Sequence, residues 1–159
     1  MTEERFIPLA KSYQDTIFRV AYSYLKNSDD ADDVTQDVLL QLYTSNTEFQ
    51  SEAHVRNWLI RVAINRCKML FRAPWRKHES LEEYAETLAF EAPEYCDLFT
   101  AVMGLDRKYR VPLYLYYYEG YSAPEIARLL HISQNTVSTR LRRARIKLKE
   151  HLTEAYSYD

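Results

Sequence analysis

Glycine is scarce in this chain, and this scarcity constrains the fold more than any other feature. Only two of the 159 residues are glycine, Gly104 and Gly120, and only five are proline. Tight β-hairpin turns depend on glycine, asparagine and proline at defined positions, so a fold rich in hairpins is disfavoured. Apolar residues instead recur with the period of an α-helix through most of the sequence. We therefore expect an all-α fold.

The periodic segments predict helices near residues 3–26, 30–45, 53–72, 94–103, 107–119, 122–130 and 134–154. Residues 73–92 are bracketed by Pro74 and Pro93, so we expect a linker there. A chain of this length forms one domain or two small helical domains. We find no apolar run long enough to cross a bilayer and no secretory leader.

Residues 120–145 have the pattern of a helix-turn-helix. Ser122 is placed to cap a helix that starts at Ala123, and Glu125 stands three residues after the cap, where it completes a capping box. Pro124 falls in the first turn, where proline is tolerated. The inner face of this short helix consists of Ile126, Ala127 and Leu130.

The second helix of this motif is predicted from near Gln134, with Ser133 as its cap. One apolar stripe runs along it, formed by Val137, Leu141, Ala144 and Leu148. The opposite face carries Asn135, Thr139 and Arg142, flanked by Ser138 and Arg143. Side chains of these types read base edges in the major groove and neutralise phosphates, so the motif indicates DNA binding. The alternative is an ordinary helical hairpin with a solvated basic face.

Charges are segregated along the chain, although the formal net charge is only -2. Residues 53–78 contain seven lysines and arginines and no acid, and residues 126–149 contain another seven and no acid. Between these blocks, residues 79–106 contain eight acids and no lysine or arginine. This pattern predicts two phosphate-facing surfaces joined by a segment that avoids nucleic acid or occupies a basic channel. The alternative is two solvated helix faces and an ordinary acidic linker.

The helix predicted at 53–72 carries a cationic strip on one side, formed by Arg61, Asn65, Lys68 and Arg72. The other side holds Val55, Leu59, Val62, Ala63 and Leu70, and Arg66 is out of place among them. Such a strip is suited to binding a nucleic-acid strand. Trp58 borders it; an indole there stacks on an unpaired base or belongs to the core.

The helix predicted at 30–45 begins with a cluster of acids, which the helix dipole stabilises at this end. Its apolar face consists of Val34, Val38 and Leu42, and its exposed positions are Asp32, Asp33, Gln36 and Asp37. These polar residues form either a docking surface for a basic partner or only the solvated side of a stable helix.

Three motifs together resemble the extracytoplasmic-function (ECF) sigma factors, which belong to the sigma-70 family of bacterial RNA polymerase. They are Asp-Ala-x-Asp-x-x-Gln at residues 30–36, the Trp-Leu to Asn segment at 58–65, and the helix-turn-helix sequences at 118–127 and 136–145. The resemblance covers nearly the whole chain. It implies a region 2-like domain at residues 1–76, an acidic linker at 77–93 and a region 4-like helix-turn-helix domain at 94–159.

The resemblance also implies three binding surfaces. The acid-rich helix would bind core polymerase through Asp32, Asp33, Gln36 and Asp37. The cationic strip and the loop before it would bind the melted minus-10 promoter element through Asn57, Trp58, Arg61, Asn65, Lys68 and Arg72. The helix-turn-helix would enter the major groove of the minus-35 element through Asn135, Thr136, Ser138, Thr139, Arg142 and Arg143.

The implied protein is a cytoplasmic sigma factor that binds core RNA polymerase and promoter DNA, directs promoter melting and transcription initiation, and is regulated by an anti-sigma factor. We expect no catalytic activity and no metal, because no histidine, serine or cysteine stands in a catalytic or ligand pattern. We also expect no cofactor, small-molecule substrate or membrane insertion. From the residues alone, a helix-turn-helix regulator that acts without polymerase and a protein-interaction module with incidental basic faces remain open.

Three residues depart from the family pattern. His131 stands where glycine is usual in the turn, so either histidine adopts a left-handed conformation or the turn has another shape. Met69 occupies a position that is commonly aspartate. Asp106 replaces the usual proline, and we expect it to act as a helix cap.

Overall fold

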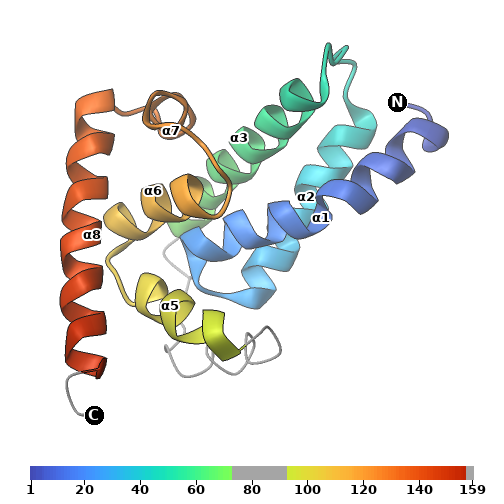
Figure 1. Cartoon of the computed structure of the whole chain (residues 1–159). Helices are drawn as coiled ribbons and strands as arrows, with labels where there is room; N and C mark the ends of the chain where they lie inside the picture. Colours follow the sequence, from blue (N-terminus) through green and yellow to red (C-terminus); the bar gives the residue numbers. More distant parts are fainter. Residues whose placement is uncertain (73–92, 157–159) are drawn as a thin grey trace. The chain divides into compact units, whose positions relative to one another are not determined.

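The computed structural model describes residues 1–72 and 93–156 (Figure 1). In these two ranges every regular element is an α-helix, as the apolar period predicts. The chain divides into two compact units, unit 1 (Met1–His78) and unit 2 (Glu79–Asp159). The expected linker at residues 73–92 lies outside the described residues.

Unit 1 is a bundle of three helices, α1 (Glu3–Leu25), α2 (Ser28–Thr44) and α3 (Glu52–Phe71), and each packs on the other two. Its core takes one buried stripe from each helix; the members include Ile17, Val20, Val34, Val38, Leu42, Leu59, Ile60 and Ile64. The predicted apolar face of α2 is therefore the buried one. Tyr43 of α2 also meets Phe6 of α1 edge to face, with 5.1 Å between ring centroids.

Side-chain caps set where α2 and α3 begin. The Asn27 side-chain oxygen accepts a hydrogen bond from the Asp30 amide at 2.8 Å, and the Ser51 hydroxyl accepts one from the His54 amide at 3.1 Å. Because Asn27 supplies the cap, α2 starts two residues earlier than the period predicts.

The buried side of α3 differs in part from the predicted one. Val55, Leu59 and Ala63 are buried as expected, but Val62 and Leu70 are only half-buried. Ile60, Ile64 and Cys67 complete the buried stripe instead. The buried side of α3 is thus rotated about the helix axis relative to the side that a simple helical wheel predicts.

Unit 2 contains α5 (Pro93–Met103), α6 (Arg107–Tyr117), α7 (Ala123–Leu130) and α8 (Gln134–Tyr156), and α8 packs against the other three. The core includes Met103, Leu113, Tyr114, Leu115, Ile126, Leu129, Val137, Leu141 and Ala144. Gly120 joins α6 to α7 with φ +74°, a conformation that favours glycine, although the space beside its Cα is open.

Asp106 occupies the N-cap position of α6, but the expected side-chain cap is not formed. Its carbonyl oxygen accepts hydrogen bonds from the Tyr109 and Arg110 amides, both at 2.9 Å. Asp106 therefore begins the helix through its backbone alone.

The helix-turn-helix in unit 2 consists of α7, a short turn and α8. Ser122 and Glu125 form the predicted capping box: the Glu125 amide donates to the Ser122 hydroxyl at 3.3 Å, and the Ser122 amide donates to the Glu125 carboxylate at 3.2 Å. His131 ends α7 in the left-handed conformation, with φ 57° and ψ 45°. The Ser133 hydroxyl then accepts from the Thr136 amide at 3.1 Å, so Ser133 caps α8 as predicted.

Candidate functional site

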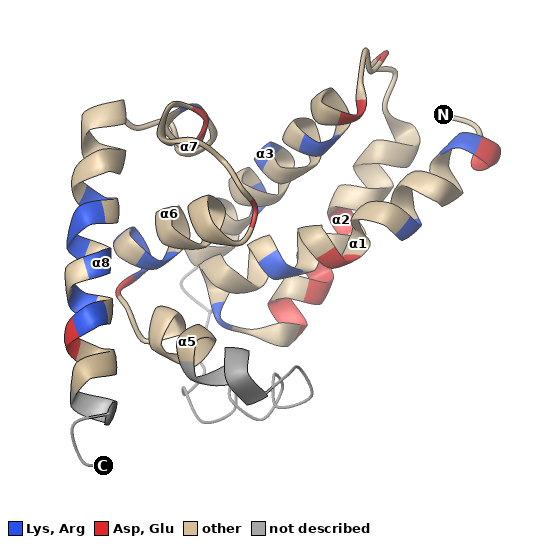
Figure 2. Cartoon of the chain, in the orientation of Figure 1, with Lys and Arg blue, Asp and Glu red and all other residues tan. Residues whose placement is uncertain are grey.

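The residues predicted to face DNA on α8 lie on its solvent side. Asn135, Ser138, Arg142 and Arg143 are exposed. Thr136 and Thr139 are half-buried, and the Thr136 hydroxyl is within 2.7 Å of the Ser133 hydroxyl at the cap. Figure 2 shows basic residues following one another along this helix. The apolar stripe is buried at Val137, Leu141 and Ala144, which leaves the polar side to solvent.

A shallow polar hollow of about 260 Å³ lies on one flank of α8, lined by Asn135, Thr136, Thr139, Arg140 and Arg143. Four of these residues are among the predicted DNA contacts. The fifth, Arg140, was missed, because the helical wheel places it close to the apolar stripe. The spacing of Thr136, Arg140 and Arg143 by four and three residues could have indicated that Arg140 shares one side of the helix with the other two.

The opposite flank of α8 carries an arginine held by tyrosines. The Arg145 side-chain Nε donates to the Tyr117 hydroxyl at 2.8 Å, and its guanidinium carbon lies 5.4 Å from the Tyr116 ring centroid. Both tyrosines belong to the end of α6 and are exposed. Arg145 is therefore anchored within unit 2, whereas Arg140 and Arg143 line the hollow.

The cationic strip of α3 faces solvent in unit 1. Arg61, Asn65 and Arg72 are exposed and Lys68 is half-buried. Partial burial, followed by the nearby charge of Arg72, lowers the pKa of Lys68 below its ordinary value. A lysine whose charged form is disfavoured in this way gains from a phosphate placed beside it.

Aromatic side chains pack at the start of this strip. The Phe49 ring, in the loop before α3, meets Trp58 edge to face at a centroid distance of 5.5 Å and His54 at 5.2 Å. The His54 Nδ1 accepts a hydrogen bond from the Gln50 amide at 3.2 Å. Trp58 and Asn57 are half-buried, so Trp58 belongs to an aromatic cluster at the surface rather than to the closed core.

The four residues of α2 that are predicted to bind core polymerase separate into two groups. Asp32, Asp33 and Gln36 are exposed, and Figure 2 shows acidic residues gathered near the start of this helix. Asp37 instead accepts from Arg66 of α3, with Nε at 3.0 Å and the terminal nitrogen at 2.9 Å from the same carboxylate oxygen. Arg66, which is out of place in the predicted apolar face, is thus explained by an acidic partner on the neighbouring helix.

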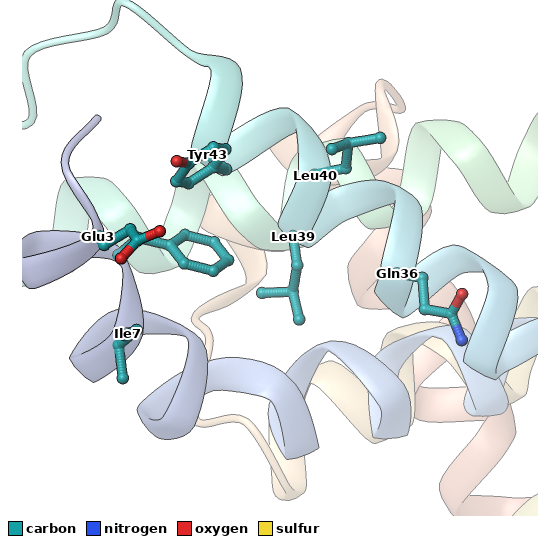
Figure 3. Close-up of a pocket in the computed structure, with 7 residues that line it drawn as sticks. Glu3, Ile7, Gln36, Leu39, Leu40 and Tyr43 are labelled. Carbon is teal, nitrogen blue, oxygen red and sulfur yellow. The ribbon is translucent and has the colours of Figure 1, made fainter.

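An apolar groove of about 560 Å³ runs between α1 and α2 (Figure 3). Its lining is Glu3, Phe6, Ile7, Gln36, Leu39, Leu40 and Tyr43. Ile7, Leu40 and Tyr43 are exposed large apolar side chains. The groove adjoins the acidic surface through Gln36, which belongs to both. This groove was not predicted from the sequence.

Among residues 1–72 and 98–153, whose side chains the structure describes, no group of three or more histidine, cysteine, aspartate or glutamate side chains is arranged to hold a metal ion. No described helix combines the length and the apolar character that crossing a membrane requires.

Comparison with known proteins defines the class. The model of sigma-70 region 2 matches residues 9–77, and a model of sigma-70 region 4 matches residues 97–148, so each motif found in the sequence falls within a matched region. The ECF RNA polymerase sigma factor SigM of Mycobacterium tuberculosis is 30% identical over 147 residues, which cover 90% of this chain and 74% of SigM.

The chain therefore belongs to the ECF sigma factors of the sigma-70 family, the RNA polymerase subunits that direct transcription initiation and are not themselves enzymes. Two solved structures share its fold. The sigma factor RpoE from Bartonella quintana, in complex with the anti-sigma factor NepR, has a TM-score of 0.71 and 19% identity, over 94% of this chain and 98% of that chain. CnrH, in complex with the cytosolic domain of CnrY, has a TM-score of 0.68 and 26% identity, over 98% and 91%.

Proposed function

We propose that this sigma factor binds its partners through three surfaces, which belong to two domains at residues 1–76 and 94–159. The acidic surface of α2 binds core polymerase through Asp32, Asp33, Gln36 and Asp37. The strip on α3 binds the melted minus-10 element through Asn57, Trp58, Arg61, Asn65, Lys68 and Arg72. The helix-turn-helix binds the minus-35 duplex through Asn135, Thr136, Ser138, Thr139, Arg142 and Arg143.

One observation carries this proposal: the exposed cations of α3 and α8 belong to two units with separate cores, while exposed acids gather on α2. Two separate basic surfaces suit two separated promoter elements. An acidic surface repels DNA and suits a basic protein partner.

Charge reversal tests the polymerase surface. The double variant Asp32→Lys/Asp33→Lys is expected to weaken binding to core polymerase by at least about tenfold, which corresponds to about 1.4 kcal/mol. Binding is measured by titrating labelled protein with core enzyme. Glu4→Lys/Asp15→Lys, at two exposed positions of α1, makes the same change in net charge and is the matched control, which should bind normally. Equal binding by all three proteins would contradict the assignment.

Promoter binding is tested on a duplex whose start site has been mapped with the reconstituted holoenzyme on a genomic library. Arg61→Gln/Asn65→Ala should reduce strand opening, measured as permanganate reactivity of minus-10 thymines, without loss of core binding. Arg142→Gln/Arg143→Gln should weaken duplex binding and lower the salt slope by about 0.9 for each phosphate that the variant no longer neutralises. If the second variant lost binding to DNA that is already melted at the minus-10 element and lacks a minus-35 element, the division of roles would be wrong.

We further propose that the protein acts in the cytoplasm and that an anti-sigma factor restrains it by covering the polymerase-binding surface. The exposed groove between α1 and α2 supports this proposal, because apolar side chains at a protein surface mark interaction sites. The test is purification of the tagged protein from its host and identification of a stoichiometric partner. The partner should suppress transcription when it is added back and should compete with core polymerase.

A further inference from the structure

Three cations surround one tyrosine at the junction of α6 and α8. The Tyr109 side chain is 7% exposed, and its ring lies 5.0 Å from the Lys108 ammonium and 5.5 Å from the Lys147 ammonium. The charges of Lys108 and Arg143 also lie near enough to its hydroxyl to affect its pKa. Lys108 comes from α6, whereas Arg143 and Lys147 are one turn apart on α8.

The cluster has an excess of positive charge. In the part of the chain that the structure describes, no carboxylate forms an ion pair with Lys108, Arg143 or Lys147. Burial alone would raise the pKa of Tyr109, but the positive charges of Lys108 and Arg143 outweigh it, and the pKa is lowered. The phenol thus lies in a positive potential that no carboxylate among the described residues neutralises through an ion pair with these cations.

The cluster continues the polar hollow on the same flank of α8. Arg143 belongs to both, and Thr136, Arg140, Arg143 and Lys147 follow one another at intervals of four, three and four residues along this flank. Lys147 lies thirteen residues after the start of α8, which is about 20 Å along the helix at 1.5 Å per residue. A recognition helix that enters the major groove at its N-terminal end reaches the sugar-phosphate backbone at such a distance.

We propose that Lys108 and Lys147, held on the Tyr109 ring, form a binding site for a DNA backbone phosphate beside the helix-turn-helix. This inference rests on the proposed binding of the minus-35 duplex by α8, and it adds residues from α6 to that interface. Tyr109 is a positioning residue: its ring holds both ammonium groups at this site by cation–π contacts.

The experiment uses holoenzyme and the mapped promoter duplex, with binding measured across a range of NaCl concentrations. Lys108→Gln and Lys147→Gln should each reduce the slope of log Kobs against log[NaCl], and the double variant should reduce it by about 0.9, because the site binds one phosphate. The reduction should be equal on promoter variants with altered minus-35 bases. Lys149→Gln is the matched control, because it removes the same charge from an exposed position of α8 on the other flank. Thermal unfolding of each variant confirms that the fold is retained.

Tyr109→Phe keeps the ring but removes the hydroxyl, so it should bind as the wild type does. Tyr109→Leu removes the ring and should weaken binding, because the ring positions both ammonium groups. Unchanged binding by Tyr109→Leu would overturn the positioning role. Unchanged slopes for both lysine variants, or an equal change for Lys149→Gln, would overturn the phosphate site. If the wild-type holoenzyme still bound the duplex normally, the proposed function would be unaffected by that result. Failure of wild-type holoenzyme to bind the duplex would overturn both.

Discussion

Two helices end on residues that are not glycine but have a positive φ angle. Lys26 follows α1 with φ 54°, and His131 follows α7 with φ 57°. The left-handed conformation costs an L-residue about 1–2 kcal/mol, and it is retained because the amide of each residue still completes its helix. The Lys26 amide donates to the Tyr22 carbonyl at 2.8 Å, and the His131 amide donates to the Ala127 carbonyl.

Substitution of His131 should reveal this strain. His131→Gly is expected to raise the free energy of unfolding by up to about 1 kcal/mol, because glycine adopts positive φ without a steric penalty. His131→Val should lower it, since a β-branched residue is strained there. Urea unfolding of the intact protein measures both changes. Lys26→Gly provides the same comparison in unit 1, and destabilisation by both glycine variants would contradict the explanation.

Local residue chemistry was largely predictable from the sequence. Ser122, Glu125 and Ser133 cap helices as expected, because a cap depends on residues three positions apart. The failure of Asp106 to cap with its side chain was not predictable, since water competes with the backbone amide as a donor to an exposed carboxylate.

At the scale of helices, the Asp37–Arg66 pair joins α2 to α3. Both side chains are about two-fifths exposed, at 41% and 38%, so water and salt screen their attraction. A double-mutant cycle with Asp37→Asn and Arg66→Gln should give a coupling free energy of about 0.2–1 kcal/mol. Urea unfolding at low and high salt measures it. Coupling that stays unchanged at high salt would show that charge is not its origin.

The helix boundaries were predicted to within a few residues, because the apolar period and the caps are local signals. The sides that the helices bury were predicted less well. Ile60 and Ile64 of α3 are buried, whereas Val62 is only half-buried. Arg140 lines a hollow although it lies near the apolar stripe. Which flank a neighbouring helix covers depends on the crossing angle, and this angle is a tertiary property that a wheel does not contain.

At the scale of the whole molecule, the two cores are separate, and destabilisation of one should not spread to the other. Leu59→Ala removes a side chain that is 1% exposed in unit 1 and should cost that unit about 2–5 kcal/mol. Hydrogen exchange of the intact protein should then show lower protection in α1 to α3 and unchanged protection in α7 and α8. Leu113→Ala, equally buried in unit 2, should give the reverse pattern. A uniform decrease in protection would indicate a single cooperative fold.

The function of the whole chain followed from motifs rather than from composition. A formal net charge of -2 gives no sign of a nucleic-acid-binding protein, whereas the separation of basic and acidic blocks does. The residues alone did not distinguish a sigma factor from a simpler regulator. That distinction came from the acid-rich motif at residues 30–36 occurring in the same chain as the helix-turn-helix, and family matches to regions 2 and 4 confirm it.

The chain contains two tryptophans, Trp58 and Trp75, and Trp58 belongs to α3 of unit 1. Residues 79–159 contain no tryptophan, so unit 2 contributes only the weaker emission of its tyrosines. In a Trp75→Phe protein, the single remaining indole is that of Trp58, at the start of the cationic strip. Its ring centroid lies 5.5 Å from that of Phe49. The proposed stacking of a minus-10 base on that indole would quench its emission, so this variant offers an optical test of the proposed minus-10 site.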